Sequence, residues 1–221
     1  IAPIKELKDE VILELWHGKT IAFKDMALSI LPHLMVTSAK KNNAKNEIVI
    51  LAATSGDTGK AALAGFANVP GTRIIVFYPK NGVSAIQEKQ MLTQEGDNTC
   101  VVAIHGNFDD AQTGVKNIFN DREFAAKLDE KGFQFSSANS INIGRLVPQI
   151  VYYFYAYTRL LGQGRIDPGE KVNFDVPTGN FGNILAAYYA KLLGKERLVM
   201  SLSDTVCRAK PNSGDITVLV H

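Results

Sequence analysis

The sequence is poor in the features that mark secreted, metal-binding or membrane proteins. It has two cysteines among 221 residues, Cys100 and Cys207, too few and too far apart for a disulfide framework or a zinc site. We therefore expect both thiols to be reduced and structural. No apolar run approaches the roughly 20 residues that cross a bilayer, and the first residues lack a signal-peptide pattern. A cytoplasmic protein with no membrane partner is the expectation.

Neither sign of charge dominates the chain. Lysine and arginine number 24 and aspartate and glutamate 22, which gives a net charge of +2. Apolar residues make up 46% and charged residues 21%, values typical of an ordinary globular protein. The lysines are scattered, so nucleic acid is not an expected partner.

Two common catalytic patterns are also missing. Residues 56–60 read Gly-Asp-Thr-Gly-Lys, but a P-loop would need glycine at position 54 and serine or threonine at 61, where this chain has Thr54 and Ala61. His17 and His33 have no serine, cysteine or acidic partner at a recognisable spacing, and no pair of histidines or cysteines has metal-ligand spacing. The sequence therefore supports neither a nucleotide triphosphatase nor a metal-dependent hydrolase, and we expect no metal.

Apolar, β-branched runs alternate with helical patterns along the chain. The runs predict buried strands, and the patterns between them predict helices, of which the fourth is broken. This alternation predicts an α/β fold with open, largely parallel sheets flanked by helices, whose ligands lie at the carboxyl ends of the strands. The expected strands are 47–53, 73–78, 100–104 and 171–176, and the expected helices are 24–42, 59–68, 84–94, 108–130, 143–161 and 183–193.

A glycine- and asparagine-rich segment, 178–183, follows the last expected strand and precedes a helix. Its two glycines let backbone N–H groups turn inward, Asn180 and Asn183 can add side-chain donors, and the helix presents its positive end. A phosphate group would suit such a segment. A plain strand-to-helix turn is an equally good interpretation of these residues alone.

The segment 54–59 follows the first expected strand in the same way. One interpretation is a site for a small anion such as a substrate carboxylate. The other is a capped helix start, in which Ser55, Asp57 or Thr58 accepts hydrogen bonds from free N–H groups.

Lys24 and Arg145 are the charged side chains best placed for chemistry. Lys24 stands beside Phe23 and apolar residues, and burial would lower its pKa and make it a nucleophile able to form a Schiff base. A solvated lysine is the alternative. Arg145 follows a donor-rich segment, and its guanidinium suits a carboxylate or phosphate. The alternative there is a helix capped by Ser140 or Asn142, with the arginine in solvent.

Read together, four segments resemble threonine synthase, a pyridoxal-phosphate enzyme of fold type II. The resemblance spans residues 11 to 193, and Lys19 stands where that family commonly has proline. It implies two α/β subdomains with the cofactor cleft between them. The segments are His17–Asp25, Thr54–Gly59, Ser140–Arg145 and Gly179–Asn183.

The resemblance also implies roles for single residues. Lys24 would be the catalytic residue and hold pyridoxal 5′-phosphate covalently, with Asp57 beside the cofactor ring. Asn142 and Arg145 would face the substrate's phosphate. The residues implied for the cofactor's phosphate are Gly179, Asn180, Phe181, Gly182 and Asn183, and those implied for the substrate carboxylate are Ser55, Gly56, Asp57 and Thr58.

Subdomain boundaries follow from the same resemblance. Residues 1–46 and 140–194 would belong to the cofactor-binding subdomain and 47–139 to a smaller one. After Gly194 the resemblance ends, and residues 195–221 do not read as the family's continuation. We therefore expect the sequence to be incomplete at both ends and to join separate pieces after residue 193.

The implied reaction belongs to threonine biosynthesis: O-phosphohomoserine and water give threonine and phosphate. Two alternatives stay open. One is another fold type II enzyme, such as a serine or threonine dehydratase, although His17-Gly18 and residues 56–59 favour threonine synthase. The other is a non-catalytic anion-binding α/β domain.

Overall fold

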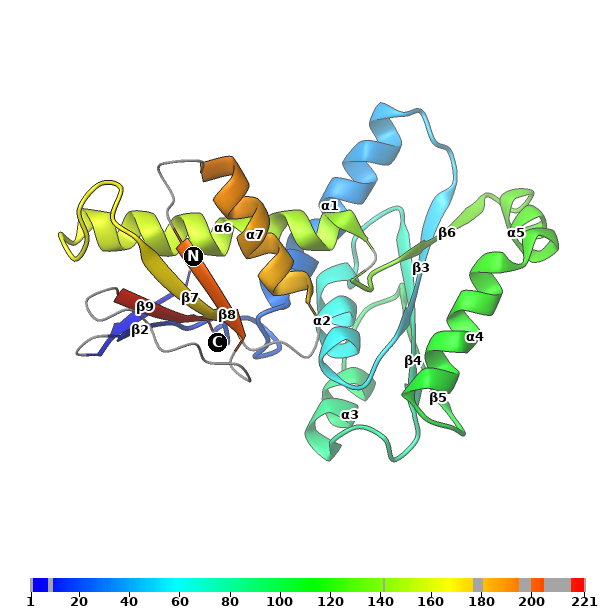
Figure 1. The fold of residues 1–221 in the computed structure, drawn as a ribbon. Coiled ribbons are helices and arrows are strands. Elements are labelled where there is room, and N and C mark those ends of the chain that lie inside the picture. The colour runs from blue at the N-terminus through cyan, green and yellow to red at the C-terminus, as the bar shows by residue number, and fades with distance from the viewer. Residues whose placement is uncertain are drawn as a thin grey trace. The chain divides into compact units, whose positions relative to one another are not determined.

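The structure, a computed structural model, describes residues 2–7, 10–140, 142–176, 181–194, 200–204 and 216–220. Contacts within the chain divide it into two compact units. Unit 1 comprises residues 1–23 and 146–221, and unit 2 comprises residues 24–145. Each unit is built around one sheet with helices packed on it (Figure 1).

The sheet of unit 2 has four parallel strands in the order β5-β4-β3-β6. The strands are β3 (Glu47–Ala53), β4 (Thr72–Pro79), β5 (Thr99–Ile104) and β6 (Phe133–Ser137). The central strand β3 is apolar from Ile48 to Ala53 and buried throughout that run. A run without alternation is required there, because helices cover both faces of the sheet.

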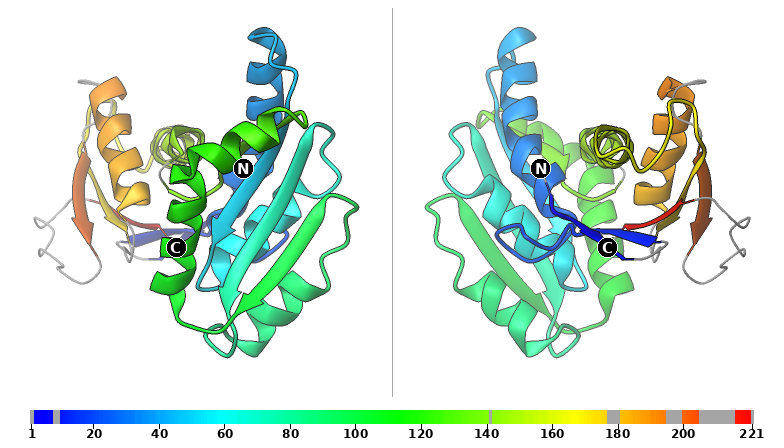
Figure 2. Two further views of the ribbon diagram at one scale, coloured as in Figure 1. Left: turned by 90° about the vertical axis from the view of Figure 1, so that its right-hand side faces the viewer. Right: turned by 90° about the vertical axis from the view of Figure 1, so that its left-hand side faces the viewer.

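Helices of unit 2 cover the two faces unequally (Figure 2). On one face lie α1 (Asp25–Lys41), α2 (Asp57–Phe66) and α3 (Ala85–Leu92), and on the other α4 (Phe108–Asn120) and α5 (Arg122–Asp129). Successive residues of β3 alternate between the two cores. The first core contains Leu28, Leu31, Ile48, Ile50, Leu63, Phe66 and Met91, and the second contains Val49, Leu51, Ala111, Val115 and Phe135.

The order in which the chain adds strands reverses at β3, so β3 and β6 are neighbours at a topological switch point. From β3 the chain moves through α2 to β4 and through α3 to β5, and it then returns through α4 and α5 to β6 on the other side of β3. In open α/β sheets such a switch point opens a crevice at the carboxyl ends of the two strands. The segments that leave those two ends are 54–58 and 138–145.

Unit 1 contains a sheet in the order β1-β2-β9-β7-β8. Its strand β1 is antiparallel to β2, and the other pairings are parallel. Phe174 packs its ring against Tyr153 of α6 with 5.2 Å between centroids. The elements are β1 (Ile4–Glu6), β2 (Glu10–Leu13), β7 (Val172–Val176), β8 (Met200–Asp204), β9 (Ile216–Val220), α6 (Ile143–Gly162), whose first three residues belong to unit 2, and α7 (Gly182–Gly194).

The predicted fold class is confirmed: the chain forms parallel sheets flanked by helices. All predicted strands and helices are present with ends shifted by a few residues, and the break expected in 108–130 falls at Asp121. That residue ends α4 and caps α5 by accepting a hydrogen bond from the Phe124 N–H. Strands β1, β2, β6, β8 and β9 were not predicted.

The unit boundary falls at Lys24, whereas the expected boundary fell at residue 46. Helix α1 groups with unit 2 because it packs on α2. Gly65 of α2 lies against the carbonyl of Leu28, with no room for a Cβ, so the two helices approach closely. Residues 200–204 and 216–220, in the segment that did not read as the family's continuation, are parallel neighbours of β7.

Among the described helices, none combines the length and the apolar character that a membrane span requires.

Candidate active site

Lys24 is the last residue before α1 and already has helical backbone angles, φ −72° and ψ −18°. Three residues earlier, Ile21 has φ 59°, in the left-handed region. A β-branched residue there is strained by roughly 1–3 kcal/mol, and such strain is concentrated at functional sites. The backbone that leads into Lys24 is therefore held in a conformation that its sequence does not favour.

The surroundings of the Lys24 amine shift its pKa in the direction that favours the neutral form. Burial lowers the pKa of Lys24, and the positive charges of Arg145 and Lys60 lower it further, while the negative charge of Asp57 opposes them. The net pKa lies below the ordinary value of a lysine. This agrees with the expectation that burial makes Lys24 a nucleophile.

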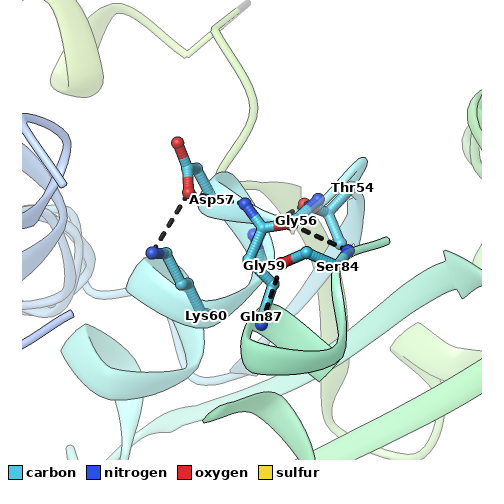
Figure 3. Close-up of polar contacts among 7 residues, drawn as sticks. All are labelled: Thr54, Gly56, Asp57, Gly59, Lys60, Ser84 and Gln87. Carbon is cyan, nitrogen blue, oxygen red and sulfur yellow. Dashed lines mark hydrogen bonds and ion pairs between the residues drawn. The ribbon is translucent and has the colours of Figure 1, made fainter. Parts of the chain in front are cut away.

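The loop after β3 is organised by Thr54. Its Oγ1 accepts hydrogen bonds from the N–H groups of Gly56 and Gly59, both at 2.9 Å (Figure 3). Thr54 rather than Ser55, Asp57 or Thr58 therefore satisfies these donors, which corrects the capping interpretation. Among the described residues the N–H groups of Asp57 and Thr58, at the start of α2, have no acceptor. Gly56 has φ 139°, which other residues rarely adopt.

The side chains of this loop differ in exposure. Ser55 is exposed and Thr58 half-buried, and within the described part of the chain neither side chain has a polar partner. Asp57 is different: its Oδ1 lies 3.1 Å from Lys60 Nζ and accepts a hydrogen bond from Gln87 Nε2 at 2.9 Å. Burial would raise the pKa of Asp57, but Gln87, Lys60 and the charge of Lys24 outweigh burial and leave the pKa below its ordinary value.

The segment after β6 supplies the third part of the site. Arg145 is buried, with 4% of its surface exposed, and its Nη1 donates a hydrogen bond to the Ala138 carbonyl at 3.1 Å. The predicted alternative of an arginine in solvent is therefore wrong. Asn142 Oδ1 accepts a hydrogen bond from the Gly144 N–H at 2.9 Å, and Asn142 Nδ2 donates to the Ser137 carbonyl at 2.8 Å. Asn142 thus caps the start of α6, the helix that carries Arg145, so the capping part of that alternative is confirmed for Asn142.

The predicted phosphate loop belongs to unit 1, and Thr178, Gly179 and Asn180 lie outside the described residues. Phe181 is 70% exposed, and α7 begins at Gly182. Asn183 is buried and accepts the Tyr153 hydroxyl hydrogen through Oδ1 at 2.7 Å. Because this hydrogen bond fixes which side of the amide carries Oδ1, the Nδ2 group of Asn183 remains as a donor for a ligand.

Two residues that contact Asp57 were not predicted as part of a site. Lys60 lies one helical turn after Asp57, a spacing that brings side chains together on a helix. Gln87 is the third residue after Ser84, and a serine followed at that distance by glutamine is the sequence signature of a capping box. The spacing reveals the cap but not the contact with Asp57, which lies 30 residues away in sequence.

Metal ligands are not gathered in the described residues: no three histidine, cysteine, aspartate or glutamate side chains there are arranged to hold an ion. His17 does have an acidic partner that the sequence analysis did not identify. Its Nε2 lies 2.7 Å from Glu14 Oε2, on the exposed surface of unit 1.

Comparisons with known proteins identify relatives over most of the chain. No model of a known protein family matches it. It is 45% identical over 201 residues to human threonine synthase-like 1 and 44% identical over 195 residues to threonine synthase of Pseudomonas aeruginosa. These matches cover 88% of this chain, which spans 27% and 39% of the two relatives.

A solved structure agrees with the sequence comparison. Pyridoxal-phosphate-bound threonine synthase from Brucella melitensis matches with a TM-score of 0.78 and 39% identity. The match covers 92% of this chain and 41% of that one.

Proposed function

This chain is a homologue of the threonine synthases over most of its length, and we propose that the protein is a pyridoxal-phosphate-dependent lyase that acts in threonine biosynthesis. It would convert O-phosphohomoserine and water into threonine and inorganic phosphate. The observation that carries the proposal is the half-buried Lys24 amine with its lowered pKa, held beside the carboxylate of Asp57.

The residues present fit the cofactor. Pyridoxal phosphate, when bound, supplies an electron sink for the carbon next to the substrate amine. Its aldehyde reacts with the neutral form of a lysine amine, and burial, which lowers the pKa of Lys24, favours that form. Asp57 is the acidic neighbour that we propose for the cofactor ring.

Lys24 would also handle the protons of the reaction. As a neutral amine it removes the proton from the α-carbon of the substrate, and as an ammonium it returns a proton at the next carbon. A general base works best when its pKa lies near the operating pH. Burial, Arg145 and Lys60 all lower the pKa of Lys24 in that direction.

Anion binding by unit 2 has two supports. The N–H groups of Asp57 and Thr58 lie at the positive N-terminal end of α2 and have no acceptor in the described chain. They are therefore suited to bind the substrate carboxylate. We propose Ser55, Gly56 and Thr58 as the backbone and hydroxyl groups around it. Arg145, oriented by Ala138, would stabilise the phosphate as it leaves.

The start of α7 supports the phosphate-loop part of the proposal. Helix N-termini offer N–H donors and a positive partial charge to phosphate. Phe181, Gly182 and Asn183 lie at this start, and Tyr153 fixes the orientation of the Asn183 amide. We propose these residues, together with Gly179 and Asn180, as the ligands of the cofactor's phosphate.

The first test is covalent attachment of the cofactor. The purified protein, loaded with pyridoxal phosphate, should show the absorbance band of the lysine-bound cofactor, and borohydride reduction should fix the label on Lys24 in peptide mapping. The Lys24→Ala variant should lose both the absorbance band and the peptide label. The Lys19→Ala variant, which changes an exposed lysine nearby in sequence, should retain both. A wild-type protein without the band would refute the proposal.

The second test distinguishes the reactions. Formation of threonine and phosphate from O-phosphohomoserine supports the proposal, and a keto acid formed from serine or threonine would assign a dehydratase instead. The proposal also includes a small-molecule substrate, which the product assay tests. It includes a cytoplasmic location as well, and detection of the protein in fractionated cells tests that part.

A further inference from the structure

The two side chains that bind Asp57 contact the same oxygen. Lys60 Nζ and Gln87 Nε2 lie 3.1 Å and 2.9 Å from Oδ1. In Figure 3 the second carboxylate oxygen points away from Lys60. The Asp57 side chain is 44% exposed, so without these contacts it would be free to rotate. One oxygen is therefore anchored, and the other remains for a ligand.

The orientation of Gln87 is fixed at its other end. Gln87 Oε1 accepts a hydrogen bond from the Ser84 N–H at 3.2 Å, and Ser84 Oγ accepts one from the Gln87 N–H at 3.3 Å. This reciprocal capping box begins α3. Because the amide oxygen faces Ser84, the amide nitrogen must face Asp57. Gly56 also leaves room for this orientation of Gln87, since a Cβ at position 56 would collide with the Gln87 side chain.

Lys60 occupies an unfavourable place for a cation. Only 8% of its side chain is exposed, and it lies in the first turns of α2, close to the positive end of the helix. It also shares the neighbourhood with the charges of Lys24 and Arg145. A buried lysine in such a place requires a counter-ion, and among the described residues Asp57 supplies it.

We propose that Gln87 and Lys60 are positioning residues that hold Asp57 through Oδ1, so that Lys60 rather than Lys24 is its ion-pair partner. A carboxylate that turned to Lys24 would stabilise the ammonium form and remove the nucleophile. Held in place, Asp57 keeps Oδ2 available for a hydroxyl or amine of the ligand. The identity of that ligand rests on the proposed function, but the geometry of the three side chains does not.

The role of Lys60 is tested on the purified full chain, freed of bound cofactor. Trapping by formaldehyde and borohydride, followed by peptide mapping, gives the pH midpoint at which Lys24 becomes reactive. In Lys60→Met the midpoint should rise by about one pH unit or more, because Asp57 turns to Lys24 and a like charge is lost. Lys60→Arg should restore most of the wild-type midpoint.

Two comparisons separate positioning from simple loss of charge. In an Asp57→Asn background, Lys60→Met should lose most of its effect, since no carboxylate remains to turn. Lys127→Met removes an exposed lysine paired with Glu123 and should leave the midpoint unchanged. A full effect of Lys60→Met in the Asp57→Asn background, or no effect in the wild type, would overturn the proposal.

The role of Gln87 is tested by the pKa of Asp57, followed by carbon NMR of the carboxyl group. Gln87→Glu keeps an acceptor for the Ser84 N–H but sets a second carboxylate against Asp57, so the pKa of Asp57 should rise. Ser84→Ala weakens the cap of α3 but leaves the contact between Gln87 and Asp57, so that pKa should change little. Equal shifts in the two variants would show that α3 stability, not positioning, is responsible.

These measurements require neither substrate nor cofactor. A protein that shows the expected midpoints but makes no threonine would refute the proposed function alone. A protein that makes threonine without the expected midpoints would refute the positioning role alone.

Discussion

Tyr153 donates its hydroxyl hydrogen to Asn183 Oδ1 at 2.7 Å, and the same hydroxyl lies 3.0 Å from the Asn183 carbonyl oxygen. Both side chains are buried, and burial raises the pKa of Tyr153 well above its ordinary value, so the phenol is always a donor. One hydroxyl thus fixes the first turn of α7 from the middle of α6.

Tyr153→Phe should leave both Asn183 oxygens without this donor and destabilise the protein by about 1–3 kcal/mol. It should also weaken cofactor affinity, because Asn183 loses its orientation. Denaturant unfolding and titration with pyridoxal phosphate measure the two effects. Tyr157→Phe removes a buried hydroxyl that binds the Glu170 carbonyl, and it should cost stability without changing cofactor affinity. Equal losses of affinity in both variants would contradict the role of Tyr153.

Thr54→Val replaces a hydroxyl by a methyl group of similar size. The N–H groups of Gly56 and Gly59 would lose their shared acceptor, at a cost of about 1–3 kcal/mol each if buried and unsatisfied. The free energy of unfolding should fall accordingly, and the labelling of Lys24 by the cofactor should slow as the loop loosens. Thr54→Ser keeps the acceptor and should stay close to the wild type in both measurements.

Gly59→Ala should be destabilising because its Cβ would lie within 3 Å of Thr54 Cγ2, Val76 Cγ1 and Met91 Sδ. Overpacking of this kind costs about 1–3 kcal/mol. Gly114→Ala is the matched control in α4, where a Cβ meets nothing within 4 Å. It should stabilise the protein by about 0.5–1 kcal/mol, so thermal unfolding should shift in opposite directions in the two variants.

Asp57→Asn should lower the pH at which Lys24 reacts with an aldehyde. Burial already lowers the pKa of Lys24, and the charge of Asp57 is the interaction that opposes this lowering. Without that charge the neutral amine persists to lower pH, and the reactivity midpoint moves in that direction. A midpoint that moves to higher pH would show that the charge of Asp57 does not act on the Lys24 amine.

Sequence patterns predicted the strands with continuous apolar runs better than the short strands and those of mixed composition. Strands β3 and β4 are continuous apolar runs because both their faces are covered. Strand β6 was missed because Phe133–Ser137 mixes aromatic and polar residues and is mostly half-buried at a sheet edge. Strands β1 and β2, of three and four residues, are too short to show a period.

Residue type and local order were enough to name candidate site residues, whose roles stay predictions. Lys24, Asp57 and Arg145 were named from their neighbours in sequence, and the charges of Asp57 and Arg145 do act on the Lys24 amine. Gln87 was not predictable as a partner of Asp57, since their contact depends on where α3 packs after β4. The capping role of Thr54 was missed because its hydroxyl reaches five residues forward to the Gly59 N–H.

The pairing of β2 with β9 determines when each unit can fold. Unit 2 is one continuous stretch, residues 24–145, and every strand of its sheet is available once that stretch has been synthesised. In unit 1, Val11 pairs with Val218, so the sheet must close a loop of about 200 residues before β2 gains its parallel neighbour. We therefore expect unit 2 to reach its native state while the chain is still on the ribosome, with β1 and β2 waiting for β9 to emerge.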